Sequence, residues 1–102
     1  MITTITTFPV PDTLGADKAR EHFAHVAPKF QTVPGLIRKQ FLFSEENHIS
    51  GGVYLWENRA AAEQFIQGKL IGMIRQEFGV EPVVQYFDTP VVVDNLSQII
   101  IA

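Results

Sequence analysis

The sequence of 102 residues predicts a single α+β domain of the ferredoxin-like type, with elements in the order βαββαβ. The first observation behind this prediction is the order of the periodic patterns along the chain: strand, helix, strand, strand, helix, strand. The second is that the two central strands carry apolar or aromatic residues on both faces, whereas a sheet with one solvated face alternates cleanly. Because the helices cover only one face, we expect a second copy of the chain to cover the other and form a homodimer.

The first strand and first helix are predicted from residues 2–33. Residues 2–10 are rich in β-branched side chains, which fit the pleated surface of a strand. Asp12 or Thr13 is the expected N-cap of the helix that follows. Pro28 falls inside the helical pattern and predicts a kink or an early end. The helix itself is indicated by apolar residues at spacings of three and four: Ala16, Ala19, Phe23, Val26, Ala27, Phe30 and Val33.

The central hairpin is predicted from strands 36–43 and 51–56, joined by the polar link 44–50. Gly51 and Gly52 remove side-chain bulk beside two aromatic residues, which predicts the close approach of a helix, a bulge or a ligand. On the first of these strands, one parity carries Ile37, Phe41 and Phe43, and the other carries Leu36, Arg38 and Leu42.

The second helix is predicted to follow Asn58, which is well placed as its N-cap. Ala60–Ala62 favour helix strongly, and the apolar stripe continues to Phe78. Gly68 and Gly72 weaken that stripe, so we expect a break or two short helices.

The C-terminal part of the chain begins with Gly79, a predicted left-handed C-cap. Residues 83–88 form the last predicted strand, and Val91–Val93 is expected to resume the extended path after a proline. The tail 95–102 is unexpectedly apolar for a chain end, and we expect it to pack on a partner subunit.

Composition excludes several classes of function. The formal charge of −3 and the scattered basic residues argue against nucleic-acid binding, which needs a basic stripe. The absence of cysteine excludes disulfides, thiolate zinc sites and a cysteine nucleophile. No signal peptide and no membrane-spanning segment is recognised, so the expected location is the cytoplasm.

The three histidines are candidates for acid–base chemistry. His22 borders the apolar face of the first helix, where it is either a proton carrier at a pocket rim or a half-buried boundary residue. His25 is three residues further on but points away from that face, so we expect a solvated side chain and no metal site. His48 lies in the polar link beside Glu45 and Glu46, either as an exposed turn residue or paired with a carboxylate at a pocket mouth.

Aromatic residues near the strand centres are either core or the lining of an apolar pocket for a flat, aromatic or polyketide-like compound. The candidates for such a lining are Phe41, Tyr54, Trp56 and Tyr86. Arg38 is expected either to extend to the sheet edge or to meet an anion.

The string SE-x-NH-xx-GG-x-YL at residues 44–55, with Pro34-Gly35-Leu36 before it, resembles the YdhR-like monooxygenases, which are small relatives of the antibiotic-biosynthesis monooxygenases. The resemblance implies a dimeric α+β barrel, in which two ferredoxin-like subunits pack sheet against sheet. It also implies oxidation of an aromatic compound by molecular oxygen, with no flavin, haem or metal as cofactor. Haem-degrading relatives carry an Asn, a Trp and a His; here Trp56 is present, but the first strand has no Asn.

The leading hypothesis is therefore a cofactor-independent monooxygenase that acts on a small hydrophobic compound. In this hypothesis His22 or His48 carries the proton, Arg38 steadies a developing enolate, and Tyr54 and Trp56 line the pocket. Two alternatives stay open: a non-catalytic ligand-binding or stress-response dimer on the same scaffold, and a cofactor-free isomerase or lyase.

Overall fold

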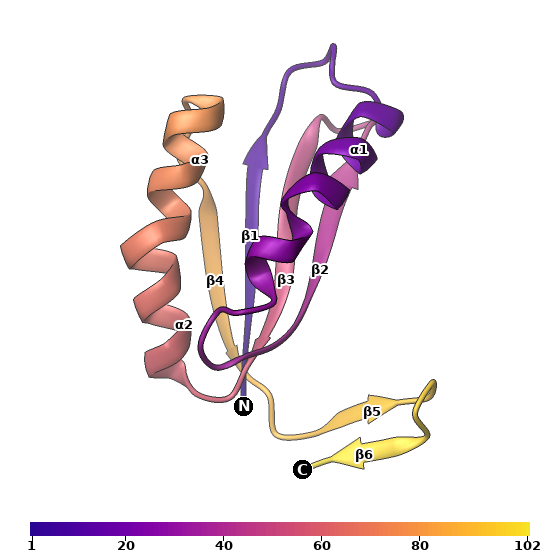
Figure 1. The fold of residues 1–102 in the computed structure, drawn as a ribbon, viewed down its shortest axis with the longest axis vertical. Coiled ribbons are helices and arrows are strands. Elements are labelled where there is room, and N and C mark those ends of the chain that lie inside the picture. The colour runs from indigo at the N-terminus through magenta and orange to yellow at the C-terminus, as the bar shows by residue number, and fades with distance from the viewer.

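The computed structural model describes residues 1–102, and helices cover one face of a four-stranded antiparallel sheet (Figure 1). The sheet order is β2-β3-β1-β4, and the α+β, ferredoxin-like βαββαβ prediction is confirmed. The elements in chain order are β1 (Ile2–Pro9), α1 (Ala16–Val26), the 3₁₀-helix η1 (Ala27–Phe30), β2 (Leu36–Ser44), β3 (Ile49–Trp56), α2 (Arg59–Phe65), the π-helix η2 (Ile66–Leu70), α3 (Ile71–Phe78), β4 (Val83–Asp88), β5 (Val92–Asp94) and β6 (Ile99–Ile101).

The first helix differs from its prediction at its N-terminus. The N-cap is Gly15, with extended backbone and no side-chain cap, so the prediction of Asp12 or Thr13 is wrong. A turn closed by the backbone bond from Leu14 to Pro11 takes up those residues before the helix begins. The predicted early end is confirmed, because α1 stops at Val26 and continues as a 3₁₀ turn that contains Pro28.

The second helix is capped as predicted but is not broken. The side chain of Asn58 accepts a hydrogen bond of 2.9 Å from the backbone of Ala61. Segments α2, η2 and α3 follow one another without interruption and appear as one coil in Figure 1. A π-helical turn around Gly68 joins α2 of 7 residues to α3 of 8 residues, so the prediction of two short helices is confirmed and that of a break is wrong. Gly79 ends the helix in the left-handed conformation with φ of 68°, as predicted.

A register shift near the start of β2 decides which face each residue occupies. Leu36 pairs with Trp56, but Arg38 pairs with Leu55, because a bulge lies between Leu36 and Arg38. The prediction that Leu36 and Arg38 share one face is therefore wrong. Leu36 packs against the core, and Lys39 lies opposite Tyr54 on that same face.

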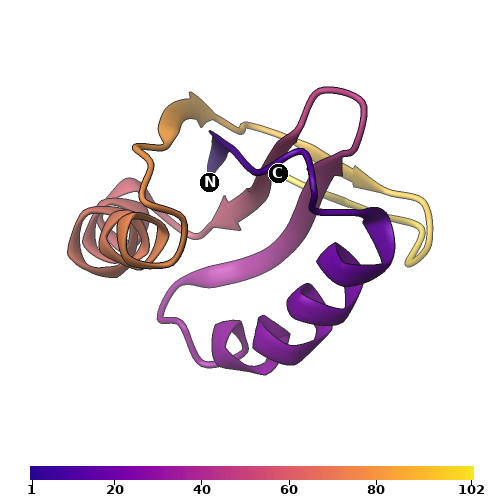
Figure 2. The same ribbon diagram turned by 90° about the horizontal axis from the view of Figure 1, so that it is seen from above.

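The two faces of the sheet differ in their cover. Figure 2 shows the helices gathered on one side. That side holds the core, whose members include the buried Tyr54, Trp56 and Ile66. The opposite side, which we call the open face, leaves Val83 62% and Phe87 47% exposed.

Strands β5 and β6 form a separate hairpin that reaches away from the main sheet (Figure 1). The backbone N–H groups of Leu96 and Ser97 donate to Oδ1 of Asp94 at 3.1 and 3.4 Å and fix the hairpin turn. These hydrogen bonds hold the pKa of Asp94 below its usual value, and the bond from Ser97 contributes most. The charge of the nearby Arg38 lowers this pKa further. The sequence indicated the extended segment and the apolar tail, but not this pairing. No helix here has the length and apolar character needed to cross a membrane.

Candidate functional site

A cavity of about 70 Å³, which we call the inner cavity, lies between the helices and the middle of the sheet. Strands β1, β2 and β3 supply its floor, and α1, η1 and α3 cover it. Aromatic side chains dominate its lining: the ring of Phe23 stacks on that of Phe41 with centroids 4.8 Å apart, and Phe30 meets Phe41 edge-on at 5.7 Å. The cavity is thus a small apolar space with few polar groups, the usual form of a site for a small molecule.

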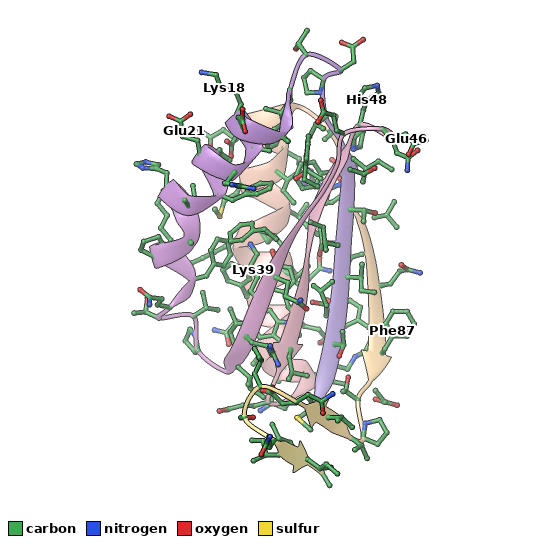
Figure 3. The ribbon with its side chains drawn as sticks, turned by 90° about the vertical axis from the view of Figure 1, so that its right-hand side faces the viewer. Lys18, Glu21, Lys39, Glu46, His48 and Phe87 are labelled. Carbon is green, nitrogen blue, oxygen red and sulfur yellow. The ribbon has the colours of Figure 1, made fainter.

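The Lys39 amine is the main polar group of the inner cavity. Its Nζ atom lies 3.3 Å from the ring centroid of Phe30, 3.8 Å from that of Phe41 and 4.7 Å from that of Tyr54. Figure 3 shows Lys39 on the helical side of the sheet and Phe87 on the other side. Burial lowers the pKa of Lys39 to about 7, while the surrounding ring faces favour the ammonium form. Near neutral pH the amine therefore occupies both protonation states.

Gly52 makes the room that Lys39 uses. A Cβ atom at Gly52 would lie 2.9 Å from the ring of Tyr54 and 3.1 Å from Cε of Lys39. At Gly51 a Cβ atom would instead overlap the backbone carbonyl of Thr6. A close approach is present at both glycines, but it comes from the side chains of Tyr54 and Lys39 at Gly52 and from the backbone of β1 at Gly51, not from the predicted helix, bulge or ligand.

Thr6 adds an unpartnered hydroxyl to the wall of the inner cavity. The residue is 1% exposed, lies opposite Gly52 in the sheet, and its Oγ1 atom has no hydrogen-bond partner. A buried hydroxyl without a partner costs about 1–3 kcal/mol. Because this Oγ1 atom has no accessible surface, a bound molecule can satisfy it only by displacing neighbouring side chains.

Tyr54 is a neutral hydroxyl at all physiological pH values, because burial raises the pKa of Tyr54 well above its usual value. Its ring stacks on Trp56 with centroids 5.7 Å apart and planes at 14°. The tyrosine thus joins the inner cavity to the core of the domain.

His22 and Glu77 stand at the rim of the inner cavity. Nε2 of His22 lies 2.8 Å from Oε1 of Glu77, and the pair joins α1 to α3. The two side chains are 36% and 47% exposed, so they contact both solvent and the cavity. An imidazole held by a carboxylate in this position can carry a proton between the cavity and solvent.

A larger space of about 370 Å³, which we call the outer hollow, adjoins the inner cavity. Phe30 and Met73 line both spaces and separate them. The basic residues of the outer hollow are Lys29 from η1 and Lys69 from η2. A molecule in the outer hollow therefore lies next to the inner cavity, with Phe30 and Met73 between them.

Among the residues that the sequence predicted for the site, the structure brings His22, Phe41 and Tyr54 together around the inner cavity. It does not bring Arg38 there. Arg38 lies on the opposite side of the sheet with Nη1 3.6 Å from Oδ2 of Asp94, because the bulge reverses its expected face.

Three further predicted residues also lie outside the inner cavity. His48 is exposed in the turn between β2 and β3, away from the helices (Figure 3). Trp56 is completely buried in the core, where its Nε1 donates to Oγ1 of Thr4 at 2.9 Å. The ring of Tyr86 on β4 lies 4.6 Å from the guanidinium of Arg59.

Lys39 and Thr6 are two site residues that the sequence analysis missed, and Glu77 is another. Lys39 shares its parity with Phe41 and Phe43, so it stands as a single charge within an aromatic face of the strand. This pattern in the sequence could have indicated Lys39 as a site residue. Thr6 carries no comparable signal, because threonine is ordinary in a strand and its missing partner appears only in three dimensions.

The fold and the cavity together define a class of protein: ferredoxin-like α+β subunits of the kind found in antibiotic-biosynthesis monooxygenases and haem degraders. Residues 5–100 match the family model described as "Putative mono-oxygenase ydhR". The chain belongs to this family, and the resemblance drawn from residues 44–55 is confirmed.

Solved structures agree on the fold. The haem degrader MhuD from Mycobacterium tuberculosis, with two haems in its active site, is 19% identical with a TM-score of 0.67, covering 92% of this chain and 100% of its own. A monooxygenase from the gene ActVA-Orf6 of Streptomyces coelicolor, in complex with nanaomycin D, is 16% identical with a TM-score of 0.64 and covers 86% of both chains. SnoaB from Streptomyces nogalater, a cofactor-independent oxygenase, is 20% identical with a TM-score of 0.60, covering 87% of this chain and 92% of its own. A search of curated proteins finds no match.

Proposed function

We propose that this protein is a cofactor-independent monooxygenase that oxidises a hydrophobic aromatic compound with an acidic C–H bond. The observation that carries the proposal is the half-buried amine of Lys39, which has no carboxylate partner and stands among aromatic rings in the cavity that Thr6 also lines. Membership of a monooxygenase family and the structural similarity to SnoaB, a cofactor-independent oxygenase, support the same chemistry.

The substrate itself supplies the electrons in this reaction. Neutral Lys39 removes a proton from the acidic carbon, and the ammonium so formed stabilises the resulting enolate. The hydroxyl of Thr6 is available as a donor to the enolate oxygen. Molecular oxygen then takes the electrons of the carbanion and forms a peroxide, which loses water. Overall a CH₂ group and O₂ give a carbonyl group and one molecule of water, so one oxygen atom enters the product.

His22 is the residue that connects this chemistry to solvent. A base that has taken a proton must release it before the next turnover, and Lys39 is largely enclosed. His22 and Glu77 line the same cavity and are partly exposed. They are therefore suited to pass the proton from the cavity to water.

The room for substrate comes from both spaces together. The inner cavity of about 70 Å³ is smaller than the cavity of roughly 150 Å³ that holds benzene in an engineered protein. A ring compound must therefore displace side chains there, and Phe30 and Met73 separate it from the outer hollow. We propose that the substrate rests in the outer hollow and inserts its reactive carbon past these two residues.

The proposed assembly is a homodimer formed through the open face. This face exposes Phe87 and Val83, and the β5–β6 hairpin exposes Val93 by 64% and Ile100 by 70%. Apolar surface of this extent on a small domain favours association. The predicted packing of the tail 95–102 on the partner is part of this proposal, now with the hairpin as the packing unit.

Oxygen uptake tests the proposed reaction. The protein is mixed with anthrone, which has an acidic CH₂ group, and uptake above the rate of autoxidation is followed with an oxygen electrode. Oxygen-18 gas identifies the source of the new carbonyl oxygen. Replacement of Lys39 by Met is expected to lower kcat/KM about 10²–10⁴-fold. Activity of the unchanged protein should rise with pH through about 7, because the base form of Lys39 appears there.

Matched variants separate site effects from general effects. Lys18→Met removes an exposed lysine of α1, and His25→Gln removes an exposed histidine one turn from His22. Both should retain full activity, whereas His22→Gln should slow turnover. Absence of oxygen uptake with anthrone would contradict the oxygenase. Product formed under nitrogen would instead identify the isomerase alternative, since the same acid–base groups can rearrange a substrate without oxygen.

A further inference from the structure

The lysines of the chain differ from most of its arginines in having no carboxylate partner. Three arginines form ion pairs with carboxylates: Arg38, Arg59 and Arg75. No lysine has a carboxylate within 4.0 Å, although the chain holds 11 acidic residues and only 8 lysines and arginines. Three of the unpaired lysines line the two adjoining spaces of the candidate site: Lys29, Lys39 and Lys69.

The outer hollow has an unusual charge for this molecule. The protein carries a formal charge of −3, yet the ten residues that line the hollow include Lys29 and Lys69 and no acid. None of the 11 acidic residues of the chain lines this hollow. Fixed positive charge in a concave space concentrates anions.

The remaining lining of the outer hollow is suited to an aromatic body. Phe30, Val33 and Phe65 supply apolar surface, and Thr32 and Gln64 add neutral polar groups. Lys69 lies in the π-helical turn η2, an irregularity that is frequent at functional sites. The hollow thus offers cations beside an apolar wall.

We infer that the outer hollow recognises the anionic substituent of an acidic aromatic compound, through Lys29 and Lys69. The substrate class is then an aromatic carboxylate whose ring reaches past Phe30 and Met73 toward the inner cavity. This inference rests on the proposed function only in taking the inner cavity and the outer hollow together as the substrate site. It assigns the hollow a specificity that the oxygen chemistry alone does not require.

Two isosteric probes test the charge preference without any turnover. Naphthalene-2-carboxylate and naphthalene-2-carboxamide have nearly the same shape and differ by one negative charge. Binding to the full-length protein is measured by isothermal titration calorimetry at low salt and at about 1 M sodium chloride. We expect the carboxylate to bind about five-fold more tightly at low salt, and the preference to disappear at high salt because the lysines are exposed.

Lysine variants assign the preference to the hollow. Lys29→Gln and Lys69→Gln should each weaken binding of the carboxylate about two-fold, and the double variant should bind both probes equally. Binding of the carboxamide should not change in any of them. Lys18→Gln, which removes an exposed lysine near the other end of α1 (Figure 3), is the matched control and should keep the full preference.

Each outcome bears on the inference separately from the oxygenase proposal. Equal affinity for the two probes, no detectable binding of either, or a preference that survives in the double variant would overturn the inference. A preference lost in the double variant supports it, even if oxygen uptake is never found. Oxygen uptake on neutral substrates that is indifferent to both lysines would support the oxygenase and overturn the inference.

Discussion

Arg38 and Lys39 are adjacent in the chain, yet they lie on opposite faces of the sheet in quite different surroundings. Arg38 is half exposed on the open face and pairs with Asp94 of the hairpin. Lys39 points under the helices, where three rings surround it and no carboxylate neutralises it. The same kind of charge therefore serves structure on one face and is left free for chemistry on the other.

The difference between the faces follows from what covers them. The helices exclude water from the face that carries Lys39, and this burial lowers the pKa of the amine to about 7. The open face has no helices, and its apolar residues Val83 and Phe87 remain exposed. One face thus encloses a titratable amine, and the other leaves apolar side chains exposed.

The largest expected effect is on association, and it tests whether the open face is the interface. Replacement of Phe87 by Asp places a charge in the apolar contact of each subunit. An unpaired buried charge costs about 3–5 kcal/mol, so the dimer dissociation constant should rise at least about 100-fold. Sedimentation velocity over a range of protein concentrations measures the change. Binding of naphthalene-2-carboxylate should survive, because Phe87 lies on the other side of the sheet from the cavity (Figure 3).

Gln76→Asp is the control for this variant, since Gln76 is exposed on α3, on the helical side. It should not change the association constant. A wild-type protein that stays monomeric at high concentration, or a Phe87→Asp protein that dimerises normally, would remove the open face as the interface. The exposed apolar residues of the open face would then need another explanation.

The next effect is smaller and concerns the stability cost of Lys39. Its pKa is about 7 in the folded protein and 10.5 when unperturbed. Between these values the unfolded chain binds more protons, so stability rises with pH, and the penalty is fully present below pH 7. Lys39→Met should therefore raise the free energy of unfolding at pH 6 by about 1–3 kcal/mol, less than the full linkage because the rings attract the ammonium. The gain should shrink as the pH approaches 10.

Urea unfolding at several pH values measures this gain. Arg38→Met is the matched variant on the open face, and it loses only an exposed ion pair with Asp94. Its effect should stay within about 0.5 kcal/mol and should not depend on pH over this range. A Lys39→Met protein that is less stable than the wild type at pH 6 would show that the aromatic contacts outweigh burial.

The order of the elements was predictable from sequence because it depends on local patterns. Strand and helix periodicity, the Asn58 cap and the Gly79 cap each need only neighbouring residues. The error at Arg38 has a different origin, since one bulge between Leu36 and Arg38 shifts the alternation of faces. A bulge has no reliable sequence signal in this strand.

The candidate site was predictable only in part for the same reason. His22, Phe41 and Tyr54 were identified because a helix face and strand parity indicate them. Trp56 was placed in the lining, but packing against the helices encloses it completely. The free hydroxyl of Thr6 depends on which partners its neighbours already hold, and that information exists only in the folded protein.

The last contrast lies within the covered face itself, between two threonines on β1. Thr4 accepts the indole N–H of Trp56, whereas Thr6 has no partner. Thr4→Val should leave the buried indole unsatisfied and destabilise the protein by about 1–3 kcal/mol. Thr6→Val should be neutral or stabilising by up to about 1 kcal/mol, because it replaces an unsatisfied hydroxyl with a methyl group of nearly the same shape. Thermal unfolding of the two variants measures the contrast.

If Thr6→Val also weakens substrate binding or slows turnover while its stability is unchanged, the hydroxyl serves the ligand rather than the fold. A loss of stability equal to that of Thr4→Val would instead make the hydroxyl part of the core.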